Sequence, residues 1–114
     1  MNPELVKSLV QVIQSLPSDD YAYLQEEFIL KNIKKTEGVC GGKARIRNSR
    51  IPVWTIISFQ NQGATDEELL RNFPILTPFD LLAVRGYYQT HQSEIDREIA
   101  ANAEEEDSDE SILL

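Results

Sequence analysis

The chain has 114 residues, which is the size of one domain with a single modest core. Hydrophobic residues make up 41% and charged residues 26% of it, as in globular proteins, and no run approaches the ~20 apolar residues of a membrane span. The net charge of −8 argues against a nucleic-acid-binding protein, but this charge is unevenly distributed along the chain.

Residues 31–50 hold seven lysines and arginines against one acid, Glu37, which is a local balance of +6. Residues 92–114 hold nine acids against one cation, Arg97, which is a local balance of −8. Such asymmetry predicts separate roles for the basic segment and for the acidic segment.

The first 31 residues are expected to form a helical pair. Asn2 and Pro3 are typical of a helix start, and Pro17 ends that helix. Ser18 is expected to cap the second helix. Apolar residues recur at helical spacing along the first one, and we expect them to form partly core and partly a homodimer contact. They are Leu5, Val6, Leu9, Val10, Ile13 and Leu16.

A basic loop with a short strand near Ile33 comes next, and then a hairpin. Apolar and basic residues alternate over 45–51, and Asn48-Ser49 suits a tight turn because Asn tolerates a positive φ. In this register Ile46 faces Ile51 and Arg47 faces Arg50.

The three arginines of the hairpin are expected to project from one exposed face. Opposed like charges destabilise a strand pair by roughly 0.2–1 kcal/mol, so the pair either binds an anion or splays apart in solvent. Lys31, Lys34 and Lys35 lie close by in the sequence.

Three helices are expected after the hairpin. The first spans Val53–Gln62 and ends at Gly63, and the second, capped by Thr65, reaches about Asn72. The third begins after the cap Thr77 and continues to about residue 100, although Gly86 weakens it by roughly 1 kcal/mol relative to alanine. Residues 102–114 form an acidic tail that is too polar to order itself.

The segment GVCGGKARIRNSRIPVW, residues 38–54, resembles the hallmark G-V-C-G-G-K-P-x-I-R-G-T-R-I-P-V of a small prokaryotic family, domain of unknown function 433. Ala44 stands where that hallmark has proline, and Asn48-Ser49 where it has Gly-Thr. Residues 63–70 and 73–80 are similar to its later motifs. This resemblance implies a helix-turn-helix-like domain of the antitoxin type, encoded beside nuclease-type toxins, with no established catalytic residues.

We therefore expect a mainly α fold: a helix-turn-helix-like (homeodomain- or winged-helix-like) three-helix unit preceded by a short β-hairpin. Its parts would be an N-terminal helical pair (1–31), the helix-turn-helix-like domain (32–101) and a disordered acidic tail (102–114).

The sequence does not indicate an enzyme. Gly42-Lys43 fails the phosphate-loop motif, because residue 37 is glutamate and residue 44 is alanine. Cys40 and His91 are too few soft ligands for a structural zinc site, and the single cysteine suits a cytoplasmic protein. We expect no cofactor and no metal.

The expected function is antitoxin-like binding of duplex DNA, of a nuclease-type toxin, or of both; the alternative is a protein-interaction module without nucleic-acid binding. An uncharacterised enzyme ranks third. The candidate nucleic-acid- or anion-binding residues are Lys34, Lys35, Lys43, Arg45, Arg47 and Arg50. The candidate partner-binding residues are Ile112, Leu113 and Leu114.

Overall fold

The computed structural model describes residues 1–113, and the side chains of residues 1–103. The fold is mainly helical with one small antiparallel sheet, which confirms the predicted class. The elements are α1 (Pro3–Gln14), α2 (Ser18–Asn32), β1 (Ile33–Lys34), the 3₁₀ helix η1 (Cys40–Gly42), β2 (Arg45–Ile46), α3 (Val53–Asn61), α4 (Asp66–Asn72), α5 (Pro78–Thr90) and α6 (Gln92–Leu113).

Three of the helix starts follow from local capping. The side chains of Asn2, Thr65 and Thr77 each accept a backbone N–H from three residues on, at 3.1–3.2 Å, as the sequence predicts. Ser18 is an exception, because it is the first residue of α2 and Pro17 occupies the capping position without a side-chain bond.

The long last helix expected from the sequence is in fact two helices. His91, at φ −131° and ψ 34°, separates α5 from α6. The His91 Nδ1 atom lies 3.0 Å from the carbonyl oxygen of Tyr87, and the Thr90 hydroxyl donates to that oxygen at 3.2 Å. The Tyr87 carbonyl also accepts the His91 amide at 2.9 Å, so side-chain and backbone groups together cap the end of α5, and the helix ends without glycine or proline.

Helix α5 is the centre of the core. It packs against α2, α3, α4, α6 and β1. A Cβ added to Gly86 would lie 2.9 Å from the Ile29 Cδ1 atom, so this glycine lets α2 pass close to α5. Its role is close packing, in addition to the helix weakening that the sequence predicts. The fully buried large apolar residues are Ile46, Ile56, Leu69, Leu81, Ile95, Val53 and Val84.

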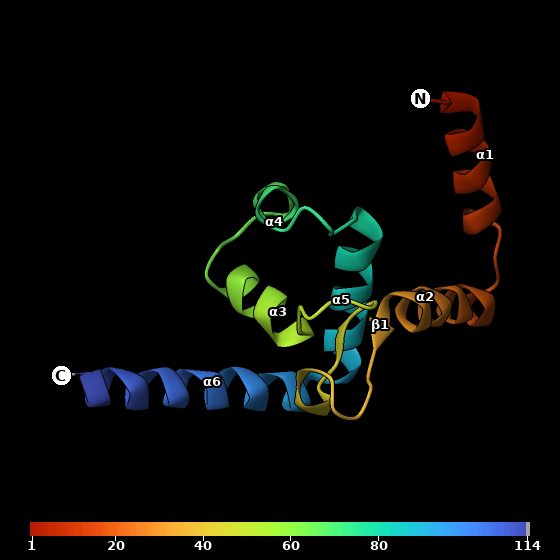
Figure 1. Ribbon diagram of the computed structural model, residues 1–114. Coiled ribbons are helices and arrows are strands. Elements are labelled where there is room, and N and C mark those ends of the chain that lie inside the picture. Colours follow the sequence, from red (N-terminus) through yellow and green to blue (C-terminus); the bar gives the residue numbers. More distant parts are fainter. Residues whose placement is uncertain (114) are drawn as a thin grey trace.

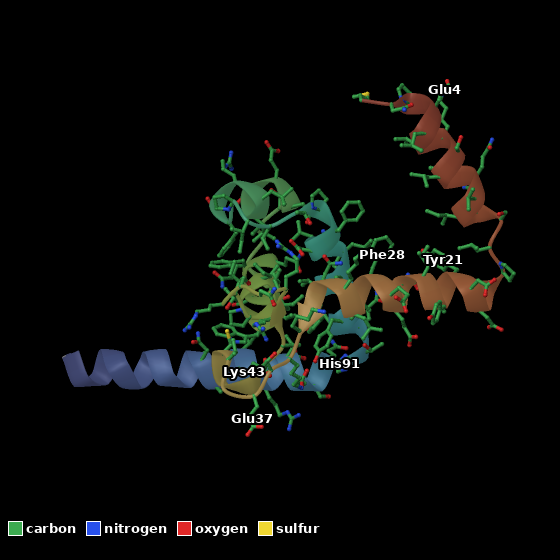
Figure 2. All side chains as sticks on the ribbon, turned by 45° about the vertical axis from the view of Figure 1, so that its right-hand side comes forward. Glu4, Tyr21, Phe28, Glu37, Lys43 and His91 are labelled. Atoms are coloured by element: carbon green, nitrogen blue, oxygen red, sulfur yellow. The ribbon has the colours of Figure 1, made fainter. Side chains whose placement is uncertain are left out.

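The molecule is elongated because its two ends leave the body. Figure 1 shows α1 standing apart at one end and α6 running away toward the C terminus. The radius of gyration is 16.9 Å, whereas a compact chain of this length has about 13 Å. No residue of α1 is buried, and in Figure 2 this helix, with Glu4 on it, lies apart from the body of the molecule. The predicted contribution of this helix to the core is therefore wrong.

Candidate nucleic-acid interface

The hairpin has the register that the sequence predicts. Arg45 pairs with Pro52 in an antiparallel bridge, and the Ile46 amide donates to the Ile51 carbonyl at 3.0 Å. On its other side β2 pairs with β1, so that Ile46 lies opposite Ile33. Residues 45–46 are thus a central strand between two neighbours, and not one side of an exposed ribbon.

The turn differs from the prediction in one respect. The residue with positive φ is Arg47, at +44°, and not Asn48. Ser49 stabilises the turn, because its amide and hydroxyl both donate to the Ile46 carbonyl, at 2.9 and 2.6 Å. The Arg47 amide donates to the Asn32 carbonyl at 2.8 Å, which connects the turn to the end of α2.

Arg47 is a structural residue rather than a free cation. Its Nε and Nη2 atoms donate to the two carboxylate oxygens of Asp80, each at 2.9 Å, and Nη2 also donates to the Ile75 carbonyl at 2.6 Å. Asp80 has no exposed surface and accepts the Thr77 amide at 2.9 Å. Burial pushes the pKa of Asp80 up, but hydrogen bonds from Arg47 and Thr77 outweigh this and hold the pKa below its usual value.

Arg45 does not project into solvent, because its side chain is buried where it meets Thr36 in the loop after β1. Its exposed fraction is 7%, and its Nη1 atom donates to the Thr36 hydroxyl at 2.9 Å. The expectation that all three hairpin arginines share one exposed face is therefore wrong, and only Arg50 is exposed.

Two of the three lysines of the predicted set, Lys35 and Lys43, lie in the loop between β1 and β2. Lys35 forms an ion pair with Glu94 at the start of α6. Lys43 is half buried, and its charge lowers the pKa of the Glu98 carboxyl, whose pKa is nevertheless raised overall by burial and by Glu94. In Figure 2 Lys43 lies on the loop beside α6. These two cations therefore face acids of α6.

A basic groove opens beside the hairpin turn. Its volume is about 420 Å³, and three separate segments provide its cations: the end of α2, β1 and the turn. The lining residues are Lys31, Lys34, Arg47, Asn48, Ser49 and Ile75. We call this hollow the basic groove.

The charges available in the basic groove differ from those in the predicted set. Because Asp80 neutralises Arg47, the net positive charge comes from Lys31 and Lys34. Both side chains are exposed, and Lys34 Nζ donates to the Leu30 carbonyl at 3.0 Å. The predicted set omitted Lys31, which the charge count over residues 31–50 had included.

Two further predictions concern groups outside this groove. Ile112, Leu113 and Leu114 lie outside the residues whose side chains are described, so their role and the predicted disorder of the tail stay predictions. Among the described residues, no group of three or more His, Cys, Asp or Glu side chains is placed to hold a metal ion. Within the described part of the chain, no helix is both long and apolar enough to cross a membrane.

Comparison with known proteins places the chain in a family. Residues 33–88 match the family model described as protein of unknown function (DUF433). The chain is also similar to a DUF433 member protein from Anabaena variabilis ATCC 29413, whose crystal structure is known, with 48% sequence identity over 88% of this chain and 99% of that one. The protein belongs to the DUF433 family.

The same comparison supports the fold, with a TM-score of 0.61 between the two DUF433 structures. No curated protein matches the sequence. The matched region includes the sheet, the hairpin turn and Asp80, so the Arg47–Asp80 ion pair and most of the basic groove lie within the family domain.

Proposed function

We propose that this DUF433 protein is a non-enzymatic, antitoxin-like DNA-binding protein whose basic groove contacts the phosphate backbone. The observation that carries the proposal is the convergence of Lys31, Lys34 and the turn on one hollow of an otherwise acidic chain. Lysine and arginine supply most phosphate contacts in protein–DNA complexes, and Asn48 and Ser49 add polar groups that suit phosphate oxygens. Arg50 extends the positive surface at the exposed turn.

Helix α5 is a poor candidate for a helix that reads bases. Its core-facing residues Leu81, Val84 and Tyr87 are buried, and its outward side offers the apolar Phe79 and Leu82. Arg85 is the one cation on it, and this side chain forms an ion pair with Asp66. Binding through the backbone at the hairpin therefore fits the charges better than major-groove reading by this helix.

The test is a titration with duplex DNA from upstream of the protein's own gene. The triple variant Lys31→Ala/Lys34→Ala/Arg50→Ala should bind at least about tenfold more weakly, which is about 1.4 kcal/mol. The matched control is Lys7→Ala/Arg71→Ala/Arg97→Ala, which removes three exposed cations outside the groove and changes the net charge equally. Equal weakening by both variants would mean that only total charge matters, and the groove assignment would then fail.

The second part of the proposal is a protein partner, a nuclease-type toxin, which would bind the acidic C-terminal segment. An acidic segment complements a protein that itself grips nucleic-acid phosphates. Deleting residues 103–114 should abolish binding to a nuclease-like protein encoded next to this one, and unchanged binding would refute this part.

The rival function, a protein-interaction module without DNA binding, is favoured by the exposed apolar residues of α1 and α5. A wild-type protein that binds the toxin but no DNA would support the rival.

A further inference from the structure

Helix α1 carries an apolar face that is left exposed by the residues whose side chains the structure describes. Its exposed fractions range from 39% at Ile13 to 59% at Val12. An isolated helix of 12 residues is marginal in water, so α1 needs a surface to pack on. The apolar residues on this face are Leu5, Val6, Leu9, Val10, Val12, Ile13 and, just beyond the helix, Leu16.

An apolar groove of matching character lies between α2 and α5. Its volume is about 400 Å³, and its apolar lining includes Ala22, Ile29, Leu82 and Ala83. Gly86 also lines this groove, at the point where Ile29 packs against α5. Leu82 is 49% exposed, and Phe79, which stacks on Phe28 with ring centroids 5.7 Å apart, is 57% exposed. In Figure 2 Phe28 points from α2 toward α5.

We propose that α1 of one copy lies in the α2–α5 groove of a second copy, and that α1 of the second copy lies in the same groove of the first. The two chains thereby form an arm-exchanged homodimer. This inference concerns assembly and does not depend on DNA or toxin binding. It names the contact surface for the homodimer that the sequence predicts.

The buried area favours a second copy as the occupant. Full burial of one aliphatic side chain removes roughly 60–120 Å² from water, so the six half-exposed ones on α1 supply about 270 Å² per arm. Two arms, with an equal area lost from each of the two grooves, bury about 1,100 Å², which exceeds the ~1,000 Å² expected of a biological interface, whereas one arm in one groove buries only half of that. Reciprocal exchange is the symmetric arrangement that uses both contacts.

The link between α1 and α2 disfavours packing of α1 on its own groove. Only Ser15, Leu16 and Pro17 join the two helices, and Pro17 restricts Leu16 to extended conformations. The Leu16 amide donates to the Ile13 carbonyl at 3.1 Å, and the Tyr21 amide to the Pro17 carbonyl at 2.9 Å. These bonds order the chain on either side of the short link, and Figure 1 shows α1 pointing away from the body of its own chain, where a second copy can receive it.

A membrane surface is a poor alternative occupant. Helices that lie on membranes carry many lysines and arginines on the polar face, whereas α1 has one, Lys7, beside the acidic Glu4. The net charge of −8 also repels anionic lipids.

The test is molar mass by light scattering in the absence of DNA, at tens of micromolar protein. The full-length wild type should have twice the mass of one 13.0 kDa chain. The arm variant Leu9→Glu/Ile13→Glu and the groove variant Leu82→Glu should both have the mass of one chain. The control Gln11→Glu/Gln14→Glu adds the same charge as the arm variant on the opposite face of α1 and should remain a dimer.

Each other outcome overturns the proposal. A monomeric wild type removes the dimer, and a dimer that survives the arm variant has its interface elsewhere. If the arm variant dissociates but Leu82→Glu does not, α1 packs on something other than the α2–α5 groove. Because the side chains of Leu9, Ile13 and Leu82 are at least 39% exposed in one chain, circular dichroism should show that all variants keep the folded body.

Discussion

Replacing Arg47 with alanine should destabilise the protein strongly, although a basic residue in a hairpin turn looks dispensable in the sequence. The guanidinium donates twice to Asp80, each time at 2.9 Å, and once to the Ile75 carbonyl at 2.6 Å. The arginine side chain is 40% exposed, but the carboxylate of Asp80 is fully buried. The variant would therefore leave a buried carboxylate without its cation.

Removing one partner of a buried ion pair costs 3–5 kcal/mol. Asp80 retains hydrogen bonds from the Thr77 amide and hydroxyl, at 2.9 and 3.2 Å. The lower end of this range of free-energy costs therefore applies. We expect a loss of about 3 kcal/mol, which for a domain of this size lowers the melting temperature by about 10 °C or more. The matched control Arg50→Ala removes the same charge from the exposed side of the turn and should cost less than about 0.5 kcal/mol.

The assay is urea denaturation followed by circular dichroism, for wild type and both variants, between pH 3 and pH 7. Because the folded-state pKa of Asp80 is lowered, its stabilisation is present above the pKa of the unfolded chain and is lost as pH falls through the folded value. The difference between wild type and Arg47→Ala should therefore be largest near pH 7 and shrink in acid. A loss below about 1 kcal/mol at pH 7, typical of surface ion pairs, would refute the reasoning.

Three further predictions concern stability. Burial, and then the charge of Glu94, raise the pKa of Glu98 in the folded protein, so the stability that this carboxyl costs grows as pH rises from the unfolded-chain pKa through the folded one; Glu98→Gln should therefore raise the urea midpoint at pH 7 but not at pH 4. Ile95→Ala should cost about 2–4 kcal/mol in the same assay, because this fully buried side chain joins α6 to the core, and a cost under 1 kcal/mol would mean that α6 is not packed there. Gly63→Ala should cost about 1 kcal/mol in thermal unfolding, since φ is +98° and space alone does not forbid a side chain; an unchanged melting temperature would contradict this.

The features that the sequence predicts well depend on local chemistry. The caps at Thr65 and Thr77 require residues only three positions apart, and the pairing of Ile46 with Ile51 follows from the turn between them. The bounds of α4 also agree with prediction, because its cap and the proline after it are both local signals.

The features that the sequence predicts badly depend on residues that are distant along the chain. Alternation along a hairpin assumes one solvent face, but the Arg45 side chain is buried and donates to Thr36, in the loop nine residues earlier in the chain. Arg47 looks free in the sequence because Asp80 is 33 positions away. The basic groove itself unites Lys31 with the turn through the packing of α2, which no local pattern encodes.

The central claim is that the basic groove contacts DNA phosphates, and the dependence of DNA affinity on salt tests it most directly. The logarithm of the binding constant, plotted against that of the salt concentration, falls with a slope of about −0.9 per phosphate contact. For Lys31→Ala/Lys34→Ala/Arg50→Ala we predict a slope flatter than that of wild type by about three units, one for each lost contact. A slope equal to that of wild type would contradict the claim.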